Sequence, residues 1–440
     1  MPAYDVIICG AGVGGLTLAN ALGRQGRRVL LVDRQRRHRG LYKGELLQPR
    51  SLEIFDALSV LPTLLNRGAL PAHRLICRAP TGAEIGALDY SLLPSRFGHC
   101  LIHYYGEIKR ALADNLSESV EMRRGVSVEG PLLDSTGRVN GVRLNADGRR
   151  TEAHATLTIA CDGHASRLRS AVGIGVELER YPHQLVAFDL AGAIGAGSDI
   201  NAYLTRLGLR ILFPMPDARA RLYVQVPAGD FRLMRRTDLA DWAEWVLETT
   251  PALHTVAGPL RTGLTTMQVM SALRFVATEW VRPGLALLGD AAHCVHPMAA
   301  QGMNAAIADA WTLSRQFVGV GRLCPDAADD GLRKYETTRR PQLEYVSRMS
   351  HNLATLFTAT SWHVRLIGDH VLRRNRSNRR LQHYLTLNMS GLGVHRFGFL
   401  DRLHQFGLPD PRARRIPNTL VSTPGDAAGL MREPSPDFGA

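Results

Sequence analysis

The sequence Asp5-Val6-Ile7-Ile8-Cys9-Gly10-Ala11-Gly12-Val13-Gly14-Gly15 decides the fold of this chain, because a short apolar run leads directly into a GxGxxG turn. A helical run from Leu16 to Gly26 follows, and a second apolar run, residues 28–32, ends at Asp33. Strand, glycine turn, helix, strand and terminal acid form the βαβ unit that binds the pyrophosphate of a dinucleotide. A glycine-rich turn without a ligand is the alternative interpretation.

The glycines of this turn have separate roles. Gly10 permits the tight turn, Gly12 lets the backbone approach a pyrophosphate, and Gly15 lets helix and strand pack closely. The pyrophosphate would lie at the N-terminus of the helix, where free N–H groups and the helix dipole favour negative charge. Asp33, 18 residues beyond Gly15, is placed to accept a hydrogen bond from a ribose hydroxyl, and its charge disfavours a 2′-phosphate there.

The composition is that of a soluble globular protein with room for two or three domains. Of the 440 residues, 45% are hydrophobic and 21% are charged. The sequence shows no N-terminal signal and no apolar run of about 18 residues that would predict a membrane-spanning helix. The six cysteines are scattered and never form CxxC, which indicates reduced packing cysteines and neither zinc nor another metal. We therefore expect a cytoplasmic protein.

The chain is basic, with 53 Lys+Arg against 40 Asp+Glu and a net charge of +13. The arginines gather in two clusters, which are Arg34, Arg36, Arg37 and Arg39, and then Arg373, Arg374, Arg376, Arg379 and Arg380. Neither cluster has interleaved aromatic residues, and no nucleic-acid-binding motif is present, so nucleic acid is disfavoured as a partner. A solvated, cofactor-facing or membrane-facing surface is expected instead.

The pattern of elements predicts a cofactor domain interrupted by a second domain. Runs such as Leu209–Phe213 and Leu222–Val226 alternate and predict an antiparallel sheet with one covered face. The fold class is therefore α/β, with a Rossmann-like cofactor domain, an antiparallel (α+β) substrate domain and a C-terminal helical segment. The expected boundaries are 1–70, 101–180 and 277–325 for the cofactor domain, 71–100 and 181–276 for the substrate domain, 326–410 for the helical region and 411–440 for an extended tail. Residues 51–65 are expected to form one helix.

Two further turns resemble the first in construction. Cys161-Asp162-Gly163-His164-Ala165-Ser166-Arg167-Leu168-Arg169 follows one predicted strand, and Gly289-Asp290-Ala291-Ala292-His293 follows another. The second continues through His296-Pro297 to Gln301-Gly302-Met303-Asn304. Each is a strand that ends in a Gly/Asp turn beside a helix start, and such turns suit oriented contacts to sugar or phosphate. Taken singly, either could be an ordinary turn, because Gly and Asp are common turn residues.

The three turns in this order resemble the single-component flavoprotein monooxygenases, the family of p-hydroxybenzoate hydroxylase, ubiquinone-ring hydroxylases and squalene epoxidase. The resemblance extends from about Tyr4 to Arg340 and includes the late sequence Tyr335-Glu336-Thr337-Thr338-Arg339-Arg340-Pro341. It implies FAD as the cofactor, NADPH or NADH as the electron donor and O2 as co-substrate. The implied activity is hydroxylation or epoxidation of a small aromatic, quinone-like or isoprenoid molecule through a C4a-hydroperoxyflavin.

The resemblance also implies which residues contact the cofactor. Gly10, Gly12, Gly14 and Gly15, with Val13 among them, would cradle the FAD pyrophosphate, and Asp33 and Arg34 would hold the adenosine side. Asp162 and Arg169 would belong to a motif shared by FAD and the transient NAD(P)H, and Asp290 would bind the ribityl or pyrophosphate part. Pro297 and the backbone of Gly302, Met303 and Asn304 would lie at the isoalloxazine, where a helix N-terminus stabilises the anionic reduced flavin.

Some positions depart from the family's pattern. Relatives often carry a cofactor-contacting Arg near Leu41, where Lys43 is the nearest substitute here, and Arg or Gln where this chain has Tyr105. The run Gly44-Glu45-Leu46-Leu47-Gln48-Pro49 resembles squalene epoxidases more than phenol hydroxylases, which indicates an apolar substrate.

The sequence contains no recognisable catalytic triad, metal cluster or P-loop, so the chemistry is expected to centre on the flavin. The substrate should lie between the loop at Pro297 and the β-rich domain. His103, Tyr203, Tyr223 and His296 are candidate acid–base or orienting groups, although a packing role is favoured for each. Two other function classes stay open: a flavin-dependent reductase or desaturase, and a non-catalytic partner in a biosynthetic assembly.

The segment from His370 to Leu400 contains no acidic residue, and apolar side chains lie among its arginines. One hypothesis is an interfacial helix that contacts an anionic membrane and receives a lipophilic substrate. The alternative, which we favour, is a helix packed on the core with solvated arginines.

Overall fold

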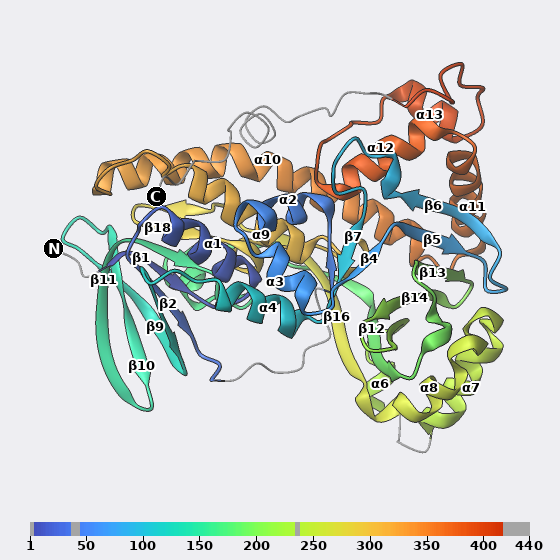
Figure 1. The fold of residues 1–440 in the computed structure, drawn as a ribbon, viewed down its shortest axis with the longest axis horizontal. Helices are drawn as coiled ribbons and strands as arrows, with labels where there is room; N and C mark the ends of the chain where they lie inside the picture. Colours follow the sequence, from blue (N-terminus) through green and yellow to red (C-terminus); the bar gives the residue numbers. More distant parts are fainter. Residues whose placement is uncertain (1–3, 37–44, 234–237, 417–440) are drawn as a thin grey trace.

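The computed structural model of the chain describes residues 4–36, 45–233 and 238–416, and it has the predicted α/β fold (Figure 1). A largely parallel sheet has the strand order β17-β18-β11-β1-β2-β8. Its strands come from distant parts of the sequence, namely β1 (Tyr4–Cys9), β2 (Val29–Asp33), β8 (Val120–Arg124), β11 (Arg149–Ala160), β17 (Val281–Arg282) and β18 (Leu285–Leu287). Because β1 pairs in parallel with both β2 and β11, the glycine turn after β1 lies in the middle of the sheet.

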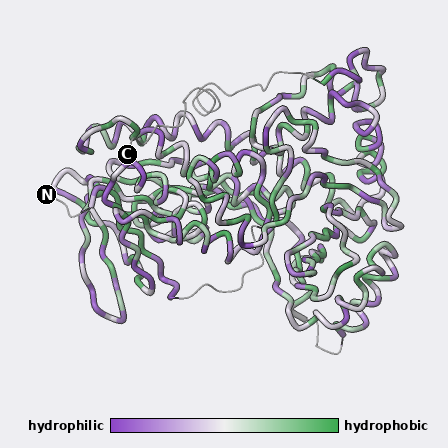
Figure 2. The backbone as a smooth tube through the Cα atoms, in the orientation of Figure 1, coloured by the Kyte–Doolittle hydropathy of each residue, from purple (hydrophilic) through white to green (hydrophobic). Residues whose placement is uncertain are grey.

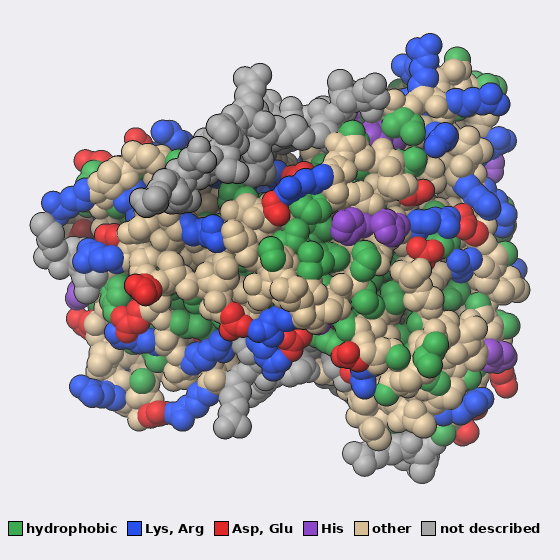
Figure 3. All heavy atoms as spheres, viewed as in Figure 1, with side chains coloured by type: hydrophobic (Ala, Val, Ile, Leu, Met, Phe, Trp, Pro, Cys, Tyr) green, Lys and Arg blue, Asp and Glu red, His purple; other side chains and the backbone are tan. Residues whose placement is uncertain are grey.

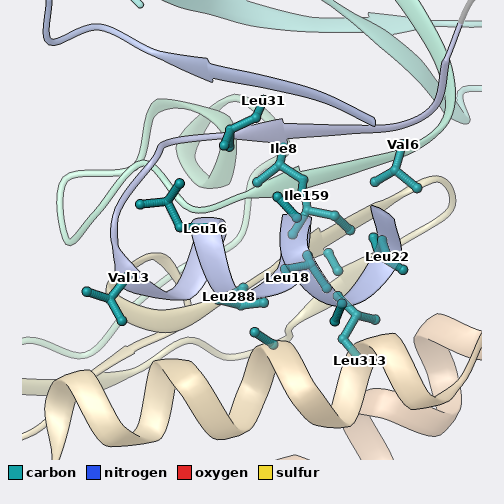
Figure 4. Close-up of a cluster of buried hydrophobic side chains, with 14 of the residues drawn as sticks. Val6, Ile8, Val13, Leu16, Leu18, Leu22, Leu31, Ile159, Leu288 and Leu313 are labelled. Carbon is teal, nitrogen blue, oxygen red and sulfur yellow. The ribbon is translucent and has the colours of Figure 1, made fainter. Parts of the chain in front are cut away.

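Helix α1 (Val13–Arg24) packs beside this sheet, and α9 (Gly302–Arg315) packs on α1. Figure 4 shows Leu16, Leu18 and Leu22 of α1 against the strands, with Leu313 reaching the same cluster from α9. A Cβ atom added at Gly14 would lie 2.7 Å from Leu288 Cδ2, so this glycine lets α1 approach the neighbouring strand and helix. Figure 2 shows the hydrophobic residues concentrated in the strands and inner helices.

A second sheet is mostly antiparallel and has the order β19-β16-β12-β15-β14-β13-β5-β6. Its strands are β5 (Arg74–Arg78), β6 (Glu84–Asp89), β12 (Glu179–Ala191), β13 (Ile200–Thr205), β14 (Gly208–Met215), β15 (Arg219–Pro227), β16 (Gln268–Val276) and β19 (His293–Cys294). The prediction of one covered face was wrong, because every residue of β13 and β14 is buried. One face packs on α7 (Asp238–Glu248) and α8 (Ala257–Gly263), and the other packs on the cofactor domain and the C-terminal helices.

Shorter elements connect the two sheets. A small sheet contains β3 (Leu46–Leu47), β4 (Leu70–Ala72) and β7 (Cys100–Ile102), and a hairpin extension contains β9 (Val126–Leu133) and β10 (Val139–Ala146). The remaining helices before residue 300 are α2 (Pro49–Ala57), α3 (Leu61–Asn66), α4 (Tyr105–Asp114), α5 (Arg167–Ala171) and α6 (Asp230–Leu233). The expected single helix over 51–65 is two helices, because the chain turns at Ser59, which has a φ of 54°.

Four helices complete the described chain: α10 (Pro325–Phe357), α11 (Trp362–Arg376), α12 (Arg379–Ser390) and α13 (Phe399–Gln405). The segment 370–400 is therefore divided between helices, and the hypothesis of an interfacial helix is wrong for α12. Leu381 and Leu387 of α12 are fully buried, and buried Arg380 pairs with Asp401 and Asp410, each at 2.8 Å. Among the described residues, no helix is long and apolar enough to cross a bilayer.

Candidate cofactor and substrate site

The glycine turn between β1 and α1 has no room for side chains at Gly10 and Gly15, and it is open at Gly12. Gly10 has a φ of 118°, and a Cβ atom there would lie 2.2 Å from the carbonyl oxygen of Cys161. A Cβ atom at Gly15 would lie 2.0 Å from the carbonyl oxygen of Gly10. At Gly12, by contrast, the nearest atom to an added Cβ would be the Tyr105 hydroxyl at 3.7 Å, so the N-terminus of α1 is open. Val13 is buried in the core.

Asp33 ends β2 beside this turn and has a cationic neighbour. One carboxylate oxygen accepts a hydrogen bond from the backbone N–H of Gln35 at 2.9 Å, and the other lies 3.9 Å from Nζ of Lys109. Lys109 is buried on α4, one turn after Tyr105, and its Nζ lies 5.9 Å from the centre of the Tyr105 ring. Arg34 is exposed. Lys43, the predicted substitute for a family arginine, lies outside the described residues. The sequence offered no local signal for Lys109.

The turn after β11 supplies a second polar group, Asp162. One oxygen of its carboxylate accepts from the backbone N–H of Arg167 at 2.8 Å. The other, Oδ1, is buried and has no hydrogen-bond partner among the described residues, so it can accept from a ligand. Arg169 connects this turn to the turn after β18, because it donates to the carbonyl oxygens of His164 at 2.9 Å and Ala291 at 2.8 Å.

The turn after β18 contains Asp290 on the 3₁₀ turn Gly289–Ala291. A buried ion cluster centred on Asp309 holds the backbone of this turn in place. Asp309 of α9 contacts His293 at 2.6 Å and Arg339 of α10 at 2.8 Å, and it accepts from the backbone N–H of Gly289 at 3.1 Å. Burial alone would raise the pKa of Asp309, but His293 and Arg339 outweigh that effect and lower it. Asp309 is therefore ionised and anchors the turn.

The loop from Pro297 to the start of α9 is anchored by two side chains. Asn304 accepts from Gln48 N–H at 2.8 Å and donates to the carbonyl oxygen of Leu46 at 2.9 Å. The Asn304 side chain is thus engaged within the protein, which leaves the backbone N–H groups of Gly302 and Met303 at the N-terminus of α9 to meet a ligand.

His296, the second anchor, is buried and contacts the second sheet. Its Nδ1 accepts from the backbone N–H of Met298 at 3.1 Å, and its Nε2 lies 2.8 Å from Nε2 of His183 on β12. Burial, with His183 and His351 nearby, lowers the pKa of His296 to about 3, so the ring is neutral at pH 7. Because Nδ1 accepts, the proton of the neutral ring is on Nε2, which donates to His183.

The other candidate acid–base residues occupy different environments. Tyr203 packs on the side of the sheet covered by α7 and α8, which favours a packing role. His103 is buried, and neither ring nitrogen has a partner among the described residues. Tyr223 has the partner that the sequence could not identify, because its hydroxyl donates to Glu45, which also pairs with buried Arg221 at 2.6 Å. Glu45 directly precedes Leu46 at the interface between the two domains.

A small cavity of about 30 Å³ lies between this loop and the second sheet. It is lined by Leu46, Leu75, Cys77, Ala202, Leu209, Ile211, Phe213, Met298, Ala300 and Phe357. Its lining contains no charged side chain among the described residues. Burial raises the pKa of the Cys77 thiol to about 12, so that group is also neutral.

These features fit a bound dinucleotide. The open N-terminus of α1 suits the pyrophosphate, Asp33 is placed for a ribose, and the unpartnered oxygen of Asp162 can accept from a hydroxyl of the ligand. The described residues hold no group of three His, Cys, Asp or Glu side chains that could bind a metal ion.

Comparison with known proteins gives the same picture over most of the chain. A family model described as "FAD binding domain" matches residues 3–350. The 6-methylpretetramide 4-monooxygenase of Streptomyces rimosus is 27% identical over 359 residues, which cover 78% of this chain and 82% of that protein. Squalene epoxidase erg1 of Schizosaccharomyces pombe is 26% identical over 371 residues, 80% of this chain and 78% of that protein. The structure of Pseudomonas aeruginosa PqsL in complex with 2-aminobenzoylacetate has a TM-score of 0.71 and 28% identity, and the match covers 81% of this chain and 97% of PqsL.

Proposed function

This chain belongs to the FAD-binding-domain family and is an FAD-dependent monooxygenase of the aromatic-hydroxylase type, and on that premise we propose that it oxygenates a neutral, apolar molecule with electrons from NAD(P)H. The bound flavin would supply oxygen activation. The cavity between the loop at Pro297 and the second sheet would hold the part of the substrate that is oxygenated.

The observation that carries the proposal is the lining of that cavity. An ionised carboxylate or phenolate would be desolvated there without a cation among the described lining residues, and burying an unpaired charge is strongly unfavourable. A hydrocarbon chain or neutral ring would instead exchange water for Leu, Ile and Phe side chains, at roughly 25 cal/mol per Å² of apolar surface buried.

The cavity must enlarge when substrate binds. Its volume of about 30 Å³ matches roughly one water molecule, whereas sites for small organic ligands are typically about 300–1,000 Å³. Phe357, at the C-terminal end of α10, and Met298, in the loop, are the long side chains best able to swing aside, because neither lies within a strand. Closure over the substrate would then exclude water from the reaction.

The chain's own residues would position the two reactants. The N-terminus of α9, with Gly302 and Met303, directs its N–H groups and positive dipole end towards the expected isoalloxazine, which stabilises an anionic reduced ring. Asn304 ties that helix end to Leu46. Glu45, just before the short strand β3 (Leu46–Leu47), pairs with Arg221 and Tyr223. These contacts connect β3 to the second sheet, which lines the cavity.

The test is substrate-stimulated NAD(P)H oxidation by the flavin-loaded protein, with NADH and NADPH each supplied as donor. The panel pairs neutral terpenoids and neutral quinolones with carboxylated analogues of similar size, and product is analysed after reaction under labelled O2. We expect stimulation and labelled product from neutral compounds. Stimulation without labelled product would instead indicate a reductase or desaturase, and protein that binds no flavin would indicate a non-catalytic partner.

A pair of variants tests the cavity itself. Ala202→Leu fills the cavity from β13, and we expect it to raise KM for the apolar substrate roughly tenfold or more, because the added methyl groups compete for the same space. Ala228→Leu makes the same change at an exposed position of the same domain and should leave KM unchanged. Equal kinetics for the two variants would show that the substrate binds elsewhere.

A further inference from the structure

The C-terminal helices expose large apolar side chains at one end of the molecule. Trp362 is 72% exposed and Leu366 65% exposed on α11, and Phe399 is 77% exposed on α13. Other exposed apolar residues of the same two helices and the following turn are Ile367, Leu400, Phe406 and Leu408. Figure 1 places α11 and α13 together at the end opposite the β9–β10 hairpin. Soluble proteins seldom expose so many large apolar residues in one place without a partner.

The same region is strongly basic. Residues 362–416 contain eleven arginines and three aspartates, a net charge of +8. None of the three aspartates is exposed, and each contacts an arginine of the region: Asp369 lies 3.6 Å from Arg365, Asp401 and Asp410 share Arg380 at 2.8 Å, and Asp410 also lies 3.9 Å from Arg412. The exposed arginines are Arg373, Arg374, Arg376, Arg379, Arg396, Arg402, Arg412, Arg414 and Arg415. Figure 3 shows basic and hydrophobic side chains together at this end.

The apolar and basic residues form one continuous surface. Trp362, Leu366 and His370 follow one another at four-residue spacing along a single stripe of α11. The end of this stripe meets the end of α13, because His370 Nε2 lies 3.2 Å from the carbonyl oxygen of Phe406. A Cβ atom added at Gly407 would lie 3.4 Å from Arg374 Nε, so the guanidinium group lies against the same turn.

We propose that this basic apolar face, formed by the exposed residues of 362–416, docks on the surface of a lipid bilayer that contains anionic lipids. Apolar side chains of an interfacial helix enter the boundary between headgroups and acyl chains, and arginines contact anionic headgroups. A second copy of the chain fits this face poorly, because its arginines would meet those of the first copy. Nucleic acid could stack on Trp362, Phe399 and Phe406, but it would leave the exposed Leu and Ile side chains of the same face in water.

The position of the face gives it a role in substrate supply, and this part rests on the proposed function. Phe357 lines the apolar cavity and ends α10, and exposed Trp362 begins α11 five residues later. Movement of this short connection would open the cavity next to the docked face. A lipophilic substrate dissolved in the bilayer could then enter the cavity without crossing water.

Vesicle binding tests the docking proposal without using catalytic activity. The full-length flavoprotein is sedimented with vesicles of equal parts phosphatidylglycerol and phosphatidylcholine, and with vesicles of phosphatidylcholine alone. We expect binding to the anionic vesicles that weakens as salt is added. Leu366→Ser, and separately Arg373→Glu/Arg374→Glu, should each reduce the bound fraction roughly tenfold or more, with melting temperature and flavin content unchanged.

Matched controls place the same changes elsewhere. Ile194→Ser alters an apolar side chain that is 84% exposed on the substrate domain, and Arg322→Glu/Arg333→Glu makes the same change of charge on two exposed arginines outside the face. Both should bind vesicles like the parent protein. The proposal is overturned by absence of binding at low salt, by equal binding of all variants, by a concentration-dependent dimer that Leu366→Ser abolishes, or by binding of a labelled oligonucleotide in place of vesicles.

Discussion

Replacing Asp309 with Asn tests whether the buried ion cluster holds the cofactor turn in place. Asp309 is fully buried and joins three segments, because it contacts Arg339 on α10, His293 on β19 and the backbone of Gly289 in the turn before Asp290. Asparagine has nearly the same shape but no charge. Asp309→Asn therefore leaves the Arg339 guanidinium buried without its counter-charge and removes one of the two carboxylate oxygens.

The structure sets the expected size and sign of the effect. Removing one partner of a buried ion pair typically costs about 3–5 kcal/mol, against about 5–15 kcal/mol for the total stability of a protein domain. The folded-state pKa of Asp309 is lowered relative to the unfolded chain, so its contribution is complete above about pH 4, the unfolded value for aspartate. That contribution is lost as pH falls through the folded pKa. The stability difference between parent and variant should therefore shrink below about pH 4.

Denaturant unfolding at pH 7 and at several lower pH values measures this difference, and flavin absorbance per protein reports cofactor retention. Asp326→Asn is the control, because Asp326 is an exposed aspartate in the first turn of α10 and its replacement should cost about 0.3–1 kcal/mol. An Asp309→Asn protein within about 1 kcal/mol of the parent, with full flavin content, would refute the assignment of Asp309 as the anchor of the turn.

Three further substitutions address the cofactor turn, the adenosine side and the flavin loop. Gly15→Ala places a methyl group 2.0 Å from the carbonyl oxygen of Gly10, so FAD binding measured by fluorescence quenching should be lost while Ala228→Ser binds normally. Lys109→Met removes a buried ammonium group and should weaken FAD binding roughly tenfold, the equivalent of one charge-assisted contact. Lys109→Arg keeps the positive charge and should restore most of the FAD affinity. An unchanged Kd of Lys109→Met for FAD would exclude a role of this residue in binding. His183→Phe leaves Nε2 of His296 without an acceptor and should cost about 1–3 kcal/mol in stability and release more H2O2 per NAD(P)H oxidised. His183→Gln, which can still accept a hydrogen bond, should behave like the parent.

The parts of the site that the sequence predicted are those set by local chemistry. The turn Gly10–Gly15 was recognisable because several of its glycines meet a steric demand of a strand–helix connection, and the structure places backbone where a Cβ would be at Gly10 and Gly15. Asp162 and Asp290 likewise lie in the turns that follow strands β11 and β18, two and three residues after the strands end. The α/β fold class could be predicted for the same reason, since the alternation and length of apolar runs are properties of short segments.

The residues that the sequence missed act through partners far away in the chain. Glu45 and Arg221 are separated by 176 residues, and His183 and His296 by 113 residues. No local pattern distinguishes such residues from solvated charges until the fold brings them together. Tertiary packing also explains the error in the second sheet, because a strand with both faces covered by different parts of the protein need not alternate strongly.

Tertiary structure also distinguishes the surroundings of two arginine clusters that looked alike in the sequence. In the first cluster, Arg36 pairs with Asp147 across a surface turn, and Arg37 and Arg39 lie outside the described residues. The second cluster belongs to a region, residues 362–416, that holds +8 of the chain's net charge of +13 and leaves only +5 for all other residues. A charge excess gathered at one end gives the protein a preferred orientation towards an anionic surface. The apolar side chains of α11 and α13 lie at the same end, so electrostatic attraction would present them to the surface that they are suited to enter.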